Sequence, residues 1–159
     1  MGHSEGICHI YVDKNADLNK AINISFDAKC QYPAVCNAVE TLLVHKEIAK
    51  KFLPKMIKKF KEANVEIRGD VKARDVVKNI KKATEQDWGT EYNDLILSVK
   101  VVNDLDEAIS HINKHSSKHT DAIITENKKN ADKFMNLVDS ASVMWNASTR
   151  FADGFRYGK

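Results

Sequence analysis

Cys36 is the residue of this sequence best suited to act as a nucleophile. It lies in PAVCNAVETLLVH (33–45), after Pro33 in a predicted loop and before a run typical of a buried strand. A nucleophilic cysteine needs a lowered thiol pKa and enough exposure to meet a substrate, and a loop position can provide both. Free cysteine is also among the most buried residue types, so packing is the alternative role. We interpret Cys8 and Cys30 as packing residues.

The histidines in the second half of the chain are candidates for a metal site. His111 and His115 are four residues apart in a predicted helix, and His119 follows shortly after. Two histidines at this spacing can bind zinc from one side of a helix. No nearby carboxylate completes such a site, and the histidines flank the apolar stripe of the helix. We therefore predict no metal and expect solvated or supporting histidines.

Polar side chains also follow a predicted strand in WNASTRF (145–151). Ligands gather at strand ends in α/β sheets, and side chains of these types can bind carboxylate or phosphate oxygens. The candidates are Asn146, Ser148, Thr149 and Arg150. For Arg150 a structural ion pair is the alternative.

Composition and charge restrict the classes of partner. The formal net charge of +3 is too small to indicate a nucleic-acid partner. The lysine-rich segment 46–63 could bind an anionic surface, but its apolar residues recur at helical spacing, so we interpret the lysines as a solvated outer face. Three cysteines without C-x-x-C spacing indicate free thiols in a reducing compartment. With no apolar leader or membrane-spanning run, we expect a cytoplasmic protein without a membrane partner.

The alternation of strand and helix patterns predicts a single α/β domain of 159 residues. Predicted strands cover residues 6–12, 40–45, 65–69, 94–102, 121–125 and 141–145. Predicted helices cover residues 15–29, 46–63, 71–83, 104–115 and 127–138; Asn15 or Asp17 caps the first, and Pro54 kinks or restarts the second. Such alternation predicts a three-layer α/β/α sandwich, with helices on both faces of the sheet.

Several segments resemble the γ-glutamyl phosphate reductase family, also called glutamate-5-semialdehyde dehydrogenase, of the aldehyde dehydrogenase superfamily. VNDLDEAISHINKHSSKHTDAI (102–123) resembles the hallmark segment of the family; Ala108, His111, Ile112, Ser116, Ser117, His119, Thr120 and Ile123 fall in register. CNAVETLLVH (36–45) is similar to the nucleophile segment, EYNDLILSVKVV (91–102) to the cofactor-facing strand, and VDSASVMWNASTRFADG (138–154) to the substrate loop. The similarity covers essentially the whole chain, and it implies an aldehyde-dehydrogenase-like catalytic domain.

The resemblance implies a reaction and a set of site residues. Cys36 is expected to attack the acyl phosphate of L-glutamate 5-phosphate and form a thioester, which hydride from NADPH reduces to L-glutamate 5-semialdehyde in proline biosynthesis. Glu91 resembles the superfamily glutamate that hydrogen-bonds the nicotinamide ribose, although an ordinary surface charge is the alternative. For the substrate, the resemblance implies Asn146, Ser148, Thr149 and Arg150, with His119 as a possible helper.

The resemblance also implies a domain organisation. Members of the family begin with a nucleotide-binding domain that precedes the first strand here, and they continue past FRYG (155–158). No G-x-G-x-x-G or comparable phosphate cradle occurs in this sequence. We therefore expect residues 1–159 to form the cysteine-bearing catalytic domain, without the nucleotide-binding domain or the C-terminal tail. The family is expected to form homo-oligomers, and a partner chain could supply the missing domain.

Three alternatives follow from the same residues. The chain could be a folded, non-catalytic fragment that retains an oligomer interface. It could be a thiol acyltransferase or hydrolase that uses Cys36 with a histidine. It could be a basic interaction module that binds through its lysine-rich helix, with affinity that falls steeply as salt is added.

Overall fold

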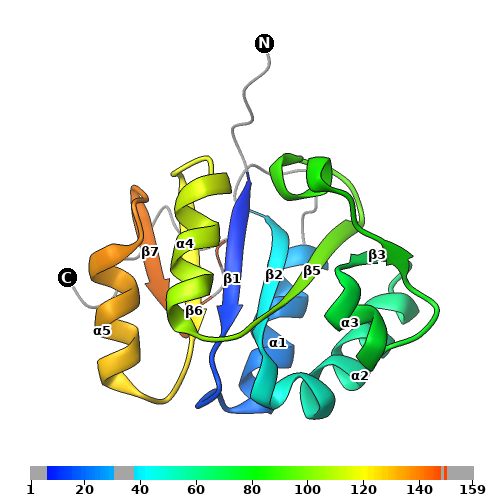
Figure 1. Cartoon of the computed structure of the whole chain (residues 1–159), viewed down its shortest axis with the longest axis horizontal. Coiled ribbons are helices and arrows are strands. Elements are labelled where there is room, and N and C mark those ends of the chain that lie inside the picture. Colours follow the sequence, from blue (N-terminus) through cyan, green and yellow to red (C-terminus); the bar gives the residue numbers. More distant parts are fainter. Residues whose placement is uncertain (1–6, 31–37, 148, 150–159) are drawn as a thin grey trace.

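A single parallel sheet organises the chain (Figure 1). The computed structural model describes residues 7–30, 38–147 and 149. Seven strands lie in the order β4-β3-β5-β2-β1-β6-β7, and every neighbouring pair is parallel. Their bounds are β1 (Cys8–Val12), β2 (Val39–His45), β3 (Glu66–Gly69), β4 (Lys81–Lys82), β5 (Ile96–Val102), β6 (Thr120–Ile124) and β7 (Ser142–Trp145).

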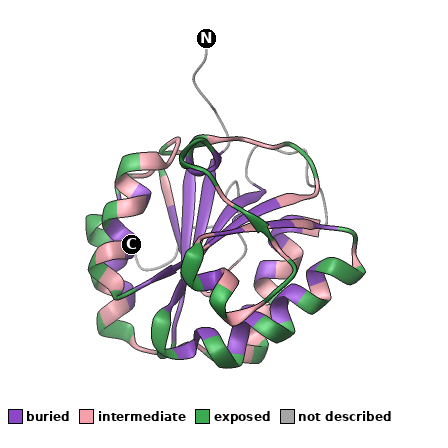
Figure 2. Ribbon diagram, turned by 45° about the vertical axis from the view of Figure 1, so that its right-hand side comes forward, coloured by how far each residue is buried: buried purple, intermediate pink, exposed green. Residues whose placement is uncertain are grey.

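Helices cover both faces of the sheet, because parallel strands need crossover connections. The helices are α1 (Leu18–Cys30), α2 (Lys46–Glu62), α3 (Val71–Val76), α4 (Leu105–His115) and α5 (Lys128–Leu137), with a short 3-10 helix η1 (Glu85–Gly89). Leu42 of β2 lies in one core with Phe52 of α2, whereas the next residue, Leu43, lies in the other core with Phe134 of α5. The central strands are therefore buried on both sides (Figure 2). The predicted three-layer α/β/α sandwich is confirmed.

Polar residues directly before the helices set where they begin. The side chain of Asp17 accepts a hydrogen bond from the Lys20 N–H at 3.0 Å, so Asp17 rather than Asn15 caps α1. Asp104 accepts from the Glu107 N–H at 2.8 Å at the start of α4. An N-terminal cap satisfies a backbone N–H that has no partner within the helix. The predicted starts of these helices are thus correct to within a few residues.

Of the two alternatives predicted at Pro54, a kink or a restart, the restart is wrong, because α2 runs as one helix from Lys46 to Glu62 with Pro54 inside it. Proline removes one backbone hydrogen bond to the carbonyl four residues earlier. Pro54 and Lys50 are both exposed, so water can satisfy the Lys50 carbonyl and the helix need not restart.

No helix in the described part of the chain combines the length and the apolar character that a membrane-spanning segment needs.

The predicted helix 71–83 is wrong in its second half. Helix α3 ends at Val76, and the chain then turns through Asn79, whose φ is 66°, into the edge strand β4. Lys82 of β4 pairs with Gly69 of β3. A Cβ on Gly69 would lie 2.6 Å from Cδ1 of Ile80, so this approach of the two segments depends on glycine. Strand pairing therefore outweighs the helical pattern of residues 77–83.

Candidate active site at the amino edge of the sheet

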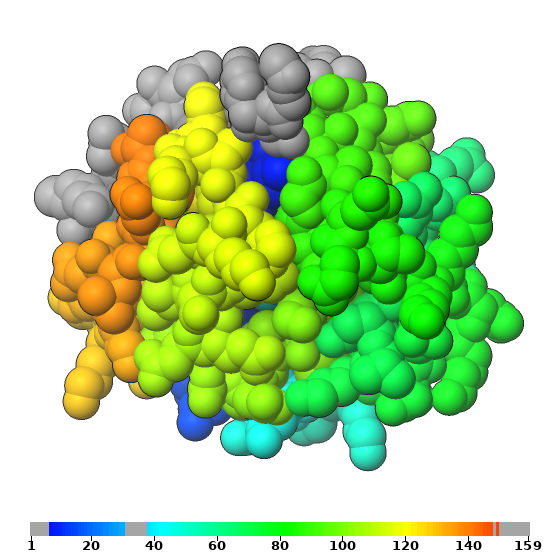
Figure 3. All heavy atoms as spheres, turned by 45° about the horizontal axis from the view of Figure 1, so that its top comes forward, coloured from blue at the N-terminus to red at the C-terminus, as the bar shows by residue number. Residues whose placement is uncertain are grey.

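Three predicted site segments enter the sheet at the edge formed by the amino ends of the strands. Cys36 lies outside the described residues; the chain resumes at the buried Ala38, directly before β2. Glu91 precedes β5, which pairs with β2, and His119 precedes β6. From this edge, the segments around 84–94 (green) and 115–120 (yellow) lie on either side of the start of β1 (Figure 3). Two strands separate β5 from β6, a distance of about 14 Å at the usual strand spacing.

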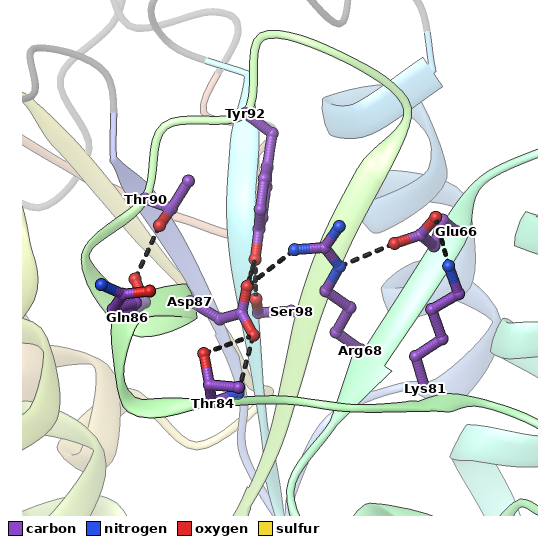
Figure 4. A network of polar contacts seen from close by, with 9 residues as sticks. All are labelled: Glu66, Arg68, Lys81, Thr84, Gln86, Asp87, Thr90, Tyr92 and Ser98. Carbon is purple, nitrogen blue, oxygen red and sulfur yellow. Dashed lines mark hydrogen bonds and ion pairs between the residues drawn. The ribbon is translucent and has the colours of Figure 1, made fainter.

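The two neighbours of Glu91 in the chain are anchored by their side chains (Figure 4). Thr90 donates from Oγ1 to the Gln86 carbonyl at 2.6 Å. The Tyr92 hydroxyl donates to Oδ1 of Asp87 at 2.9 Å and lies 2.6 Å from Oγ of Ser98 in β5. Glu91 itself is partly exposed. These contacts anchor the chain on both sides of Glu91.

Asp87 is the centre of this anchoring network (Figure 4). Its carboxylate accepts from Nη1 of Arg68 at 2.9 Å and from the Thr84 N–H at 2.7 Å. Burial opposes ionisation of Asp87, but hydrogen bonds from Thr84, Arg68 and Tyr92 outweigh it and hold the pKa of its carboxyl below the usual range. Burial and the Asp87 carboxylate raise the pKa of Tyr92 to about 12. At neutral pH the network is therefore an ionised carboxylate held by an arginine and a protonated tyrosine.

A buried ion pair lies where β2 begins. Nζ of Lys29, at the end of α1, is 2.9 Å from Oε1 of Glu40, and both side chains are 0% exposed. The other carboxylate oxygen of Glu40 accepts from the Asn93 N–H at 3.3 Å. Burial lowers the pKa of Lys29 and raises that of Glu40, and the charge of each group opposes the shift of the other. Sequence reasoning missed this pair, although a glutamate in an otherwise apolar strand was a usable signal.

A second buried carboxylate, Asp121, follows His119 two residues later in the chain. Nδ1 of His119 is 2.7 Å from Oγ1 of Thr120. The Asp121 carboxylate accepts from the His9 N–H and from Oγ of Ser116, each at 2.8 Å, and from Oγ of Ser140. These contacts hold the segment that leads into β6 against β1 and the start of β7. Asp121 therefore holds the hallmark segment in place where it enters β6. His119 lies in the same stretch and is partly exposed.

The other two histidines of that segment are partly exposed and lie in an aromatic cluster. The His111 ring centroid is 4.5 Å from that of His115, 5.5 Å from that of His9 and 5.6 Å from that of Trp88. Burial, with the nearby His9 and His115, lowers the pKa of His111 to about 2, so its imidazole is neutral at physiological pH. The described residues include no group of three or more His, Cys, Asp or Glu that could hold a metal ion.

Asn146, the residue directly after β7, is placed apart from Glu91 and His119. Asn146 lies at the opposite, carboxyl edge of the sheet, where its side chain accepts from the Thr125 N–H at 2.9 Å and donates to Glu126 at 3.2 Å. Thr149 is buried, and its hydroxyl has no partner among the described atoms. Ser148 and Arg150 lie outside the described residues. The structure thus shows a structural use for Asn146 and leaves the substrate role of the loop a prediction.

Comparison with known proteins identifies close relatives of the whole chain. No protein-family model matches it. The γ-glutamyl phosphate reductase of Methanococcoides burtonii is 62% identical over 100% of this chain and 36% of that protein. The crystal structure of γ-glutamyl phosphate reductase from Thermotoga maritima matches with a TM-score of 0.90 and 51% identity, over 94% of this chain and 36% of that one. The resemblance inferred from the sequence is confirmed, and the chain spans 36% of the length of both relatives.

A more distant structure shares the fold alone. An engineered glycolyl-CoA reductase, solved with bound NADP+, matches 97% of this chain with a TM-score of 0.72 at 14% identity. At that level of identity the likeness concerns the path of the chain and not its chemistry. It agrees with the parallel seven-stranded sheet and the covering helices described above.

Proposed function

Because the chain is similar along its whole length to γ-glutamyl phosphate reductases, we propose that it forms the cysteine-bearing part of an enzyme that reduces L-glutamate 5-phosphate to L-glutamate 5-semialdehyde. The observation that carries this proposal is the 62% identity over 100% of the chain, which includes the segment around Cys36. This reaction belongs to proline biosynthesis. A thiol nucleophile suits a reducing compartment such as the cytoplasm.

In the proposed reaction the Cys36 thiolate attacks the carbonyl carbon of the acyl phosphate. A carbon–sulfur bond forms, and the bond between the carbonyl carbon and the bridging oxygen of the phosphate breaks. Inorganic phosphate leaves with the electron pair of that bond. The thioester divides a difficult acyl reduction into two easier steps. A bound NADPH supplies the hydride for the second step. Reduction releases the semialdehyde and regenerates the thiolate.

Glu91 is the described residue that suits the nicotinamide end of the cofactor. Glu91 is partly exposed and precedes β5 at the amino edge, and the anchored Thr90 and Tyr92 hold the backbone on both sides of it. A carboxylate in such a position can accept hydrogen bonds from ribose hydroxyls. We assign the adenosine and pyrophosphate to a nucleotide-binding domain outside these 159 residues, because the sequence has no glycine-rich phosphate cradle.

Selective alkylation tests the role of Cys36, and the other two cysteines provide a low background. Cys8 is 0% exposed, and burial raises the pKa of Cys30 to about 11, so both should react slowly with iodoacetamide near pH 7.5. We expect Cys36 to be alkylated preferentially and to be protected by L-glutamate 5-phosphate. The modified residue is identified by peptide mass spectrometry over a range of pH values.

A Cys36→Ser variant is the matched control for this experiment. It should lose the fast alkylation, the thioester adduct seen by intact mass spectrometry, and the release of inorganic phosphate. Uniform labelling of the cysteines, or labelling that the substrate does not slow, contradicts the proposal. Thioester formation and hydrolysis with no requirement for NADPH would instead indicate a thiol acyltransferase or hydrolase.

A second candidate function is a non-catalytic fragment that retains the fold and an oligomer interface. The chain spans 36% of the length of the relatives it matches. Thioester formation with L-glutamate 5-phosphate distinguishes the two functions, because this step requires Cys36 and no NADPH. Its absence, together with absence of NADPH binding in a titration, favours the fragment that retains only the fold and an oligomer interface.

A further inference from the structure

We propose that Lys29 and Glu40 are positioning residues, whose buried ion pair sets the chain on both sides of residues 31–37 against the segment that follows Glu91. The inference rests on the proposed function, because it gives the pair a role in aligning the Cys36 thiol with the acyl phosphate. Neither residue is placed in contact with the substrate. Both act through the chain segments that they join.

The contacts of the pair join three segments that are distant in the sequence. Lys29 lies at the end of α1, Glu40 is the second residue of β2, and the two side chains meet across 11 residues of chain. The Glu40 carboxylate uses one oxygen for Lys29 and the other for the Asn93 N–H. Nζ of Lys29 also lies 5.9 Å from the centroid of the Tyr92 ring. Lys29 therefore contacts both β2 and the segment that follows Glu91. Glu40 contacts both the end of α1 and the same segment.

The junction continues into the network that anchors Glu91. Tyr92 is hydrogen-bonded to Asp87 and Ser98, so the segment contacted by the pair is itself tied to β5. The described chain on both sides of residues 31–37 and the segment that follows Glu91 are thus held in one frame at the amino edge. A small displacement of reacting groups can slow a reaction about 100-fold, so such a frame has a direct use in catalysis.

The complete burial of the Lys29–Glu40 pair argues against a role in stability alone. Both side chains are 0% exposed, and β2 is otherwise mainly apolar and buried. Taking two charges out of water offsets most of their attraction, so an apolar pair of similar volume is often as stable or more stable. What an apolar pair cannot supply is the directed contact of one carboxylate with both an ammonium and a backbone N–H.

The experiment compares two reactions of Cys36. Thioester formation requires the thiol to be aligned with the substrate, whereas alkylation by iodoacetamide does not. The 159-residue chain and the double variant Lys29→Met/Glu40→Leu are assayed for thioester formation with L-glutamate 5-phosphate, for alkylation by iodoacetamide, and for the midpoint of thermal unfolding. Replacing both partners leaves no unpaired charge, so we expect an unfolding midpoint close to that of the parent. We expect the alkylation rate to stay within about threefold of that of the parent. We expect thioester formation to be slower by about tenfold or more.

Two further variants make the outcome unambiguous. Lys128→Met/Asp132→Leu removes an exposed ion pair on α5 with the same change of charge, and neither rate should change. Glu40→Asp keeps the charge and shortens the side chain, so it should show the same selective loss of thioester formation and serves if the double variant does not fold.

Each contrary result has one meaning. A folded double variant that forms the thioester at the parental rate overturns the positioning role and leaves the proposed function standing. An equal loss of alkylation and thioester formation overturns it as well, because the defect then lies in the thiol itself. A parent chain that forms no thioester at all overturns both the proposed function and this inference.

Discussion

Buried polar groups at the amino edge of the sheet carry most of the functional interest at the level of single residues. Glu40, Asp87 and Asp121 are each buried, and each is held by partners from a different part of the chain. A buried charge without such partners is strongly disfavoured, so these contacts require the local geometry to be well defined. Glu40 lies in β2, Asp87 in η1 and Asp121 in β6, close to where the segments with Glu91 and His119 enter the sheet.

His111 should make the stability of the fold depend on pH. Its pKa is lowered from 6.5 to about 2 in the folded chain by burial and by His9, His115, Lys100 and Lys114. Between these two pH values the unfolded chain binds the extra proton, so the free energy of unfolding falls as the pH falls from 6.5 toward 2. The slope due to one group is at most about 1.4 kcal/mol per pH unit.

Urea unfolding at several pH values between 4 and 8 measures this dependence. A His111→Phe variant, which retains a ring of similar size, should show a flatter profile than the parent between pH 4 and 6.5. His45 and His115 also have lowered pKa values, so part of the dependence should persist in the variant. An unchanged slope in His111→Phe would show that His111 is protonated in the folded chain.

Secondary-structure elements follow the apolar periodicity except where a tertiary contact competes with it. The segment 71–83 has a helical pattern, yet residues 81–82 pair with β3 as an edge strand. Nothing local in the sequence reveals that pairing, because its partner, Arg68–Gly69, lies across α3. The N-terminal caps, in contrast, depend only on nearby residues and could be predicted from Asp17, Asp104 and Asn127.

Replacing Pro54 with alanine should stabilise the fold. Pro54 lies inside α2 on its exposed side, where alanine restores a backbone hydrogen bond without disturbing the core. The greater helix propensity of alanine outweighs the greater freedom of the unfolded chain, so we expect the free energy of unfolding to rise by about 1–2 kcal/mol. Urea unfolding followed by circular dichroism measures the change. Lys55→Ala, at the exposed neighbouring position, is the control and should change stability little; a destabilised Pro54→Ala would mean that α2 requires its proline geometry.

At the scale of the whole molecule, the central strands connect the two cores into one structure. Adjacent residues of β2 face opposite layers, and β1 and β2 lie between β5 and β6 in the middle of the sheet. Loss of either helical layer would expose one face of these strands to water. The two layers should therefore not unfold separately.

The two tryptophans allow this cooperativity to be measured. Trp88 lies in η1 near β5, and Trp145 lies at the end of β7. We expect fluorescence of the single-tryptophan variants Trp88→Phe and Trp145→Phe to report the same unfolding as far-ultraviolet circular dichroism of the same variant. Midpoints that differ between the probes within one variant would show that one side of the sheet unfolds before the other.

The general rule for α/β sheets and the family resemblance point to opposite edges of the sheet. Ligands of open parallel sheets usually bind at the carboxyl ends of the strands, and Asn146 does lie there. Glu91 and His119, which the family resemblance singled out, enter the sheet at the amino edge instead. Strand order, which brings β5 next to β2, cannot be deduced from the periodicity of either strand.

The sequence by itself determined the alternation of strands and helices, most of the helix starts and the resemblance to a family, because all of these depend on local patterns or on matching letters. Tertiary structure alone decided that Lys29, Glu40 and Asn93 meet, that Asp87 holds both Arg68 and Tyr92, and that Lys81–Lys82 pair as a strand. The physical reason is that a buried charge or an edge strand is stable only with a partner, and these partners lie far away in the sequence or in a neighbouring layer.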